Sequence, residues 1–108
     1  GFEMVFVDDA SRDGTLAELT SLKSTYPELR VVRHLNQCGQ STAVRSGVKA
    51  ARAPWIATLD GDGQNDPADI PRLLATRDGA DPAVRCYAGW RTTRRDSFVK
   101  RITSKIAN

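Results

Sequence analysis

Two acidic clusters each follow a short apolar run in this chain of 108 residues. They are Val7-Asp8-Asp9 and Leu59-Asp60-Gly61-Asp62-Gly63-Gln64. Aspartates at the end of a strand project into the crevice where open α/β sheets bind ligands. Like charges brought together destabilise a fold unless a cation or a hydrogen-bonded ligand lies between them. Because hard oxygen donors suit Mg²⁺ or Mn²⁺, the clusters indicate a divalent metal with a phosphate-bearing ligand.

The second cluster has the spacing of a metal site. Asp60, Asp62 and Gln64 occupy alternate positions, so all three side chains reach one ion if the segment is extended. The intervening glycines permit unusual backbone shapes and a close approach by a diphosphate. A calcium-binding loop also alternates its ligands, but no glutamate stands at the required later position. A purely structural turn remains the alternative interpretation.

The first cluster is suited to a nucleoside. The carboxylates of Asp8 and Asp9, at the tip of a strand, can accept hydrogen bonds from a base N–H or from ribose hydroxyls. Ser11 and Gly14 shape a tight turn into the next helix. The alternative is a strand-to-helix turn in which the acids are incidental.

Two weaker signals lie between the clusters. The polar turn at residues 36–41 leads into a helix, and its backbone N–H groups could face a phosphate. His34 is interpreted as a surface histidine or one with satisfied hydrogen bonds rather than as a catalytic base.

A basic segment closes the chain. Residues 91–105 contain six Lys and Arg residues against one acid, Asp96. If residues 94–108 are helical, a stripe of basic and hydroxyl side chains lies beside an apolar one. The segment is then either a solvated face, a site for an anionic group or a contact with an anionic membrane surface. The overall net charge of +3 is too small to indicate a nucleic-acid partner.

The elements that position these residues alternate along the chain. Apolar runs predict strands at residues 2–7, 29–33, 55–59 and 84–90. A capping box of Thr15 and Glu18 starts a helix that extends to about Ser24. Small residues mark a second helix at 40–51, and we expect them to let it lie close against the sheet. A third helix begins at Asp66, with Pro67 in its first turn. This order predicts one α/β domain with a mostly parallel sheet.

The composition fits a soluble protein of ordinary type. No apolar stretch is long enough to span a bilayer, and no signal peptide opens the chain. Cys38 and Cys86 lack metal-ligand spacing, so we expect reduced thiols in a cytoplasmic setting. The almost continuously apolar run at 2–7 is typical of a strand covered on both faces, and such a strand at the very start suggests a larger domain.

Several motifs follow one another in a fixed order. They are Val7-Asp8-Asp9-x-Ser11-x-Asp13-Gly14-Thr15, Asn36-x-x-Gly39-Gln40-Ser41, Gly47, Leu59-Asp60-Gly61-Asp62-Gly63-Gln64-x-Asp66-Pro67, Gly89-Trp90-Arg91-x-x-Arg94-Arg95-Asp96 and Lys100-Arg101-x-x-Ser104-x-x-x-Asn108. In this order they resemble the family 2 glycosyltransferases, and within them the dolichyl-phosphate mannosyltransferase branch with its bacterial polyprenyl-phosphate relatives. The resemblance covers essentially the whole chain.

The resemblance implies a GT-A fold, a Rossmann-like nucleotide-sugar domain that uses Mg²⁺ or Mn²⁺. It implies an inverting transfer of a sugar from a nucleoside diphosphate sugar, GDP- or UDP-linked, to a polyprenyl phosphate at the cytoplasmic face of a membrane. The implied nucleotide-binding residues are Asp8, Asp9 and Asp60. The implied metal ligands are Asp60, Asp62 and Gln64. The implied catalytic residues are Asp62, Arg91, Arg101 and Ser104, the last three holding the acceptor phosphate or the donor diphosphate.

Two departures from the family pattern limit what the chain does alone. Family members have an earlier strand that ends in a Pro-x-x-Asn-Glu-like motif, and they continue beyond the position of Asn108. We therefore expect residues 1–108 to be a partial GT-A domain, incomplete at both ends. A non-catalytic fragment that binds nucleotide sugars is an alternative. A phosphoacceptor receiver domain is a further one, but it leaves residues 60–64 and the basic segment unexplained.

Overall fold

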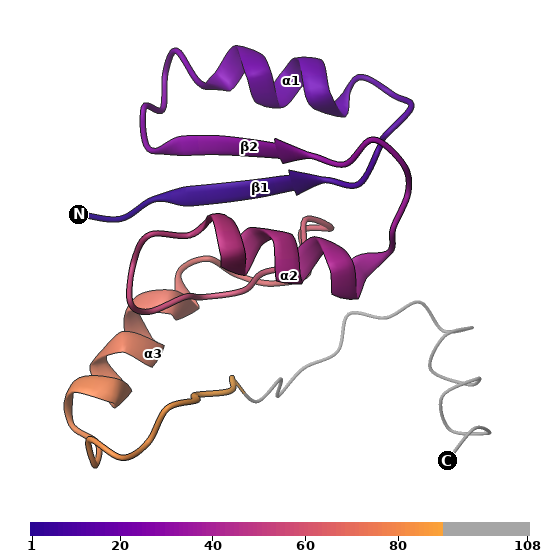
Figure 1. Ribbon diagram of the computed structural model, residues 1–108. Coiled ribbons are helices and arrows are strands. Elements are labelled where there is room, and N and C mark those ends of the chain that lie inside the picture. Colours follow the sequence, from indigo (N-terminus) through magenta and orange to yellow (C-terminus); the bar gives the residue numbers. More distant parts are fainter. Residues whose placement is uncertain (90–108) are drawn as a thin grey trace, which may run out of the picture. The chain divides into compact units, whose positions relative to one another are not determined.

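The computed structural model describes residues 1–89 (Figure 1). The chain divides into two compact units, Gly1–Thr58 and a second that begins at Leu59. The first unit contains strand β1 (Met4–Asp8), helix α1 (Thr15–Leu22), strand β2 (Leu29–Arg33) and helix α2 (Gln40–Ala50). The second unit contains helix α3 (Asp69–Asp78). None of the helices in residues 1–89 is both long and apolar enough to cross a membrane.

Strands β1 and β2 form a parallel pair, as the alternation of elements predicts. Met4 is opposite Leu29 at one end, and Asp8 is opposite Arg33 at the other. Both strands lie within two residues of their predicted bounds. Leu29 is the buried apolar residue of the described chain, at 4% exposure. The parallel register brings the carboxyl ends of both strands, and the loops that follow them, to one edge of the sheet.

Helix α1 starts differently from the predicted capping box. Its cap is Gly14, and Thr15 is its first helical residue. The Asp13 carboxylate accepts hydrogen bonds from the Thr15 N–H at 3.0 Å and from the Thr15 hydroxyl at 2.5 Å. The capping box is therefore wrong, because the nearby carboxylate engages the hydroxyl that was expected to cap the helix. The helix then ends at Leu22 rather than at about Ser24.

Helix α2 agrees with its predicted range to within one residue. Figure 1 shows α1 and α2 on opposite sides of the strand pair. A Cβ atom on Gly47 would lie 3.3 Å from the Val7 Cγ2 atom, so α2 passes close to β1 at this point. The expectation that small residues let this helix approach the sheet is thus confirmed.

A second set of contacts ties the amino ends of the strands to the end of α2. The Arg30 Nη1 atom donates to Glu3 Oε2 at 2.8 Å and to the Ala50 carbonyl oxygen at 2.7 Å. Glu3 Oε1 accepts the backbone N–H groups of Arg52 and Ala53. These donors, first the Arg52 N–H and then the Arg30 guanidinium, lower the pKa of Glu3. The helix end is thereby fixed at the edge of the sheet opposite the carboxyl ends.

The two remaining strand predictions are wrong in the described chain. Residues 55–59 form no strand, and neither do residues 84–89. A strand needs a hydrogen-bonded neighbour, and in residues 1–89 the sheet consists of β1 and β2. The apolar residues of the third run accordingly stay partly exposed, with Trp55 at 38% and Ile56 at 45%. Trp90 and the expected helix at 94–108 lie outside the described residues.

Helix α3 begins three residues after the predicted start. The Asp66 carboxylate accepts the N–H of Ala68 at 2.9 Å, and the Asp66 carbonyl accepts the N–H of Asp69 at 3.0 Å. Asp66 thus stabilises a turn that contains Pro67 and precedes the helix, which starts at Asp69. The prediction that the helix begins at Asp66 is therefore wrong, because the Asp66 carboxylate stabilises the preceding turn and Ala68 is the cap of the helix.

Candidate nucleotide-binding site

Asp8 is a buried carboxylate at the last position of β1. It is 3% exposed, and its Oδ1 atom accepts the backbone N–H of Ser11 at 3.1 Å. Its Oδ2 atom has no hydrogen-bond partner among residues 1–89, and the Arg33 Nε atom lies 3.6 Å away. A buried carboxylate with an unused lone pair is costly for the fold, so Asp8 marks this edge as a candidate ligand site.

Asp9 has a different environment, although it is the next residue. Its Oδ1 atom accepts the Cys38 N–H at 2.9 Å and lies 2.6 Å from His34 Nδ1. Its Oδ2 atom accepts the Gly39 N–H at 2.8 Å. The His34 hydrogen bond, followed by the Cys38 N–H, lowers the pKa of Asp9. Asp9 therefore fastens the loop before α2 to the end of β1.

His34 completes this connection. Its Nδ1 atom faces Asp9, and its Nε2 atom lies 2.7 Å from the Ser46 hydroxyl oxygen on α2. The imidazole is 12% exposed. The interpretation of His34 as a histidine with satisfied hydrogen bonds is confirmed. Both nitrogens have partners, so His34 links the end of β2 to β1 and to α2.

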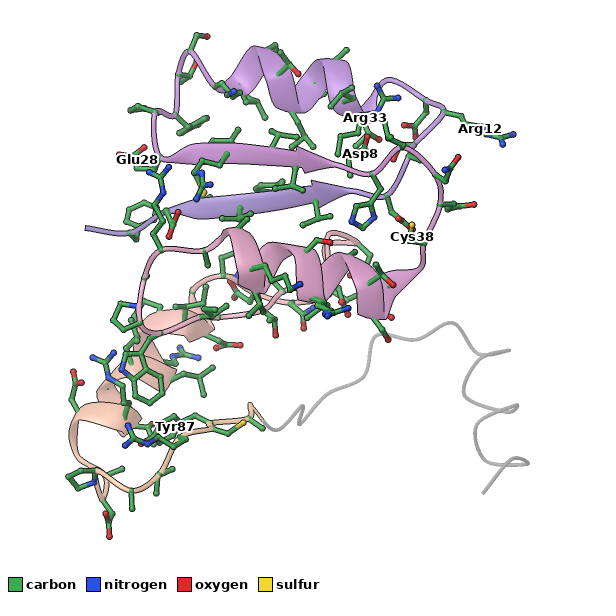
Figure 2. All side chains as sticks on the ribbon, in the orientation of Figure 1. Asp8, Arg12, Glu28, Arg33, Cys38 and Tyr87 are labelled. Atoms are coloured by element: carbon green, nitrogen blue, oxygen red, sulfur yellow. The ribbon has the colours of Figure 1, made fainter. Side chains whose placement is uncertain are left out.

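A groove lies at the carboxyl ends of the two strands. Its volume is about 580 Å³. Figure 2 shows Asp8, Arg33 and Cys38 near these strand ends, and Arg12 on the loop after β1 with its side chain directed outward. The lining residues are Ala10, Ser11, Arg12, Arg33, Leu35, Asn36 and Gln37. Guanidinium, amide and hydroxyl groups thus surround the space that follows the first acidic cluster, a donor-rich setting that suits a nucleotide.

Sequence reasoning did not select Arg12 and Arg33 for this site. Arg33 is the register partner of Asp8, so the parallel pairing brings it to the same edge. Arg12 lies two residues after Ala10. Ala10 has a φ of 58°, a left-handed backbone conformation that turns the chain after β1. The sequence could have indicated Arg33, because it is the last residue of the second predicted strand. Parallel pairing places the end of that strand beside the end of the first.

The second acidic cluster belongs to the second unit. Its side chains are exposed, and Asp62 Oδ1 accepts the Gln64 N–H at 3.0 Å across Gly63, which has a φ of 74°. The cluster offers carboxylate and amide oxygens, which fit Mg²⁺ or Mn²⁺ in donor type. Within residues 1–89, the acidic, His and Cys side chains that bring three ligand atoms together are those of Asp9, His34 and Cys38. The second acidic cluster does not form such a group in the described residues.

Three residues near the end of the chain were predicted to hold the acceptor phosphate. Arg91, Arg101 and Ser104 lie outside the described residues.

Cys38 and Cys86 are free and exposed, as expected for unpaired thiols.

Comparisons with known proteins agree on a family. Residues 1–104 match the family model described as Glycosyl transferase family 2. Dodecaprenyl-phosphate galacturonate synthase from Rhizobium johnstonii is 37% identical over 99% of this chain and 32% of its own length. Undecaprenyl-phosphate 4-deoxy-4-formamido-L-arabinose transferase from Pseudomonas savastanoi is 36% identical over 99% of this chain and 31% of its own length. No solved structure matches the chain significantly.

The chain thus spans about a third of the length of these curated relatives. The family match covers nearly all of the chain, and the parallel β1–α1–β2 unit agrees with a GT-A, Rossmann-like fold. The expected resemblance and fold class are therefore confirmed. The chain belongs to glycosyl transferase family 2.

Proposed function

We propose that the protein transfers a sugar from a nucleoside diphosphate sugar to a polyprenyl phosphate, inverting the anomeric carbon. The observation that carries the proposal is the similarity, over 99% of this chain, to relatives named for dodecaprenyl and undecaprenyl phosphate. The groove at the carboxyl ends of β1 and β2 supports it, because this edge is where sheets of this class bind nucleotides.

The nucleoside end of the donor belongs to the first unit. We assign the base and ribose of a GDP- or UDP-sugar to the groove, with Asn36 and Gln37 offering amide donors and acceptors. Asp8 and Asp9 act at the same end. Asp9 keeps the 36–39 loop in position by accepting its backbone hydrogen bonds, and Asp8 supplies a buried carboxylate at the end of β1.

The diphosphate end requires a cation. Asp60, Asp62 and Gln64 would hold Mg²⁺ or Mn²⁺, with Asp62 as the principal ligand, and Asp60 would also contact the nucleotide. The bound ion would act as a Lewis acid for the departing diphosphate. The turn in which Asp62 accepts the Gln64 N–H supports this role, because it fixes one carboxylate oxygen relative to the loop backbone.

The acceptor phosphate would be held by Arg91, Arg101 and Ser104. Guanidinium forks and a hydroxyl match the geometry of a phosphate. A phosphate monoester is already anionic near neutral pH, so it needs orientation more than deprotonation. The basic segment would also lie against the anionic cytoplasmic face of a membrane, where such a lipid resides. The work of these residues is therefore positioning.

Calorimetry on the full-length protein tests the donor assignment. UDP- and GDP-sugars are titrated with and without Mn²⁺, beside a transfer assay with a polyprenyl phosphate. We expect one nucleotide class to bind in a manner that Mn²⁺ strengthens, and the same class to support transfer. Binding without transfer to any polyprenyl phosphate would support the alternative of a nucleotide-sugar-binding protein. Failure of both nucleotide classes to bind would reject the proposed function.

A further inference from the structure

Three potential metal ligands of different chemistry meet at the carboxyl ends of β1 and β2. A carboxylate oxygen of Asp9, a ring nitrogen of His34 and the Sγ atom of Cys38 all lie within 4.8 Å of one another. They come from two loops: Asp9 lies in the loop after β1, and His34 and Cys38 lie in the loop that joins β2 to α2. We propose that these three side chains form a Zn²⁺ site, made of residues other than those assigned to Mg²⁺ or Mn²⁺.

The donor set selects the metal. Thiolate, imidazole and carboxylate are the ligands of Zn²⁺ in proteins, whereas Mg²⁺ binds oxygen donors. With the usual bond lengths, tetrahedral Zn²⁺ holds such ligand atoms roughly 3.3–3.6 Å apart. From atoms that already lie within 4.8 Å of one another, this geometry requires an inward movement of exposed Cys38 and a small separation of the Asp9 and His34 ligand atoms. Three protein ligands leave a fourth position for water.

The groups around the three ligands already orient them. The Asp9 carboxylate is fixed by the N–H groups of Cys38 at 2.9 Å and Gly39 at 2.8 Å, so it is held close to the residue that carries the thiol. The His34 Nε2 atom lies 2.7 Å from the Ser46 hydroxyl. A ligating imidazole commonly donates its second N–H to such a partner. His34 can therefore bind the ion through Nδ1 while Ser46 accepts the hydrogen on Nε2.

Binding changes the contacts in a defined way. The Cys38 thiol gives up its hydrogen bond to the Asn36 carbonyl oxygen, 3.1 Å away, and loses its proton to solvent. The remaining proton of the neutral imidazole resides on Nε2. The ion enters between Asp9 Oδ1 and His34 Nδ1, which are 2.6 Å apart without it, so these two atoms must separate. The resulting crosslink would join the ends of both strands to the loop before α2. Since Asn36 and Gln37 line the adjacent groove, the ion would also rigidify one wall of it.

Co²⁺ substitution in the full-length protein tests the site without using enzyme activity. We expect a thiolate-to-cobalt absorption band and the visible bands of tetrahedral Co²⁺, both displaced by Zn²⁺ but not by Mg²⁺. Cys38→Ser should remove the thiolate band of this site and weaken Zn²⁺ binding by roughly 100-fold or more. Cys86→Ser is the matched control, because Cys86 is also free and exposed but lies outside the cluster, and it should change neither signal.

A second variant tests the orienting partner. Ser46→Ala should keep the thiolate band and weaken Zn²⁺ binding by about 10-fold, because the imidazole loses its oriented acceptor. The proposal is overturned if the wild-type protein gives no thiolate band, or if Cys38→Ser binds Zn²⁺ as tightly as wild type. Circular dichroism of each variant separates loss of a ligand from loss of the fold. Neither result depends on the proposed transferase activity.

Discussion

Two adjacent carboxylates, Asp8 and Asp9, have different surroundings in this chain. Asp8 is buried and has one oxygen without a hydrogen bond in the described residues, whereas both oxygens of Asp9 accept hydrogen bonds from the protein. The sequence predicted that both lie at a strand end. It could not predict that their hydrogen bonding differs, because the partners of Asp9 are residues 34, 38 and 39, which only the fold brings near.

The environment of Asp9 predicts a pH-dependent stability. Because its pKa is lowered from 3.8 by hydrogen bonds in the folded state, Asp9 contributes stability above about pH 4, and this contribution is lost as the pH falls through the folded-state pKa. Asp9→Asn should therefore destabilise the full-length protein at pH 7 and progressively less below pH 4. Urea unfolding of both proteins at several pH values measures this.

A matched control for this variant is Asp69→Asn. Asp69 is an exposed carboxylate whose ion pair with Arg72 lies at the surface, so its replacement should change the urea midpoint little at any pH. An Asp9→Asn destabilisation that stayed constant from pH 7 to pH 3 would contradict the role assigned to its ionised form.

The metal assignment gives a second prediction for a single residue. Asp62→Ala should lower metal-dependent sugar transfer by roughly 100-fold or more, because the charge on the departing diphosphate would lose its counter-ion. Initial rates at increasing Mn²⁺ concentration measure the loss. Asp78→Ala, which removes another exposed carboxylate of the second unit, should leave the rate unchanged. Equal turnover by Asp62→Ala and wild type would remove Asp62 from the metal site.

At the scale of elements, the packing of α2 against β1 depends on Gly47. A Cβ there would already be 3.3 Å from Val7 Cγ2, so the branched side chain of Gly47→Val has no room. We expect a loss of roughly 1–3 kcal/mol in the free energy of unfolding, measured with urea. Thr42→Val, on an exposed position of the same helix, should change it little. A similar loss in both variants would mean that the close approach is not the cause.

The basic segment at residues 91–105 yields a prediction that rests on the sequence. Arg101→Ala in the full-length protein should raise the KM for polyprenyl phosphate far more than the KM for the donor, because a guanidinium on the acceptor phosphate is lost. Steady-state kinetics with each substrate varied in turn separate the two values. Equal increases in both would argue against an acceptor role.

Elements were predictable where local pattern and packing agreed. Helix α2 has its predicted range because its small residues suit both a helix and a close approach to β1. The run at 55–59 has the composition of a strand, but a strand is also defined by a neighbour, and the described residues provide none. The start of α1 was predicted wrongly because the Asp13 carboxylate binds the Thr15 hydroxyl. The capping-box pattern considers only residues 15 and 18 and does not include this competing partner.

At the scale of the whole molecule, the order of the motifs predicted the family, which the match over residues 1–104 confirms. The contacts between distant residues were not predictable. Cys38 and Cys86 have no metal-ligand spacing between them, yet the fold brings the Cys38 sulfur atom within 4.8 Å of ligand atoms from Asp9 and His34. Spacing along the sequence identifies sites that one segment forms, whereas this group combines residues from two loops at one edge of the sheet.

The formation of a lipid-linked sugar tests the central claim most directly. The full-length protein is incubated with Mn²⁺, labelled UDP- and GDP-sugars in turn, and undecaprenyl phosphate, and the label in the organic phase is measured. We predict labelled lipid with one donor class, none when EDTA removes the metal, and none when undecaprenol replaces its phosphate. Donor that binds but leaves all its label in the aqueous phase, with every polyprenyl phosphate offered, would contradict the account.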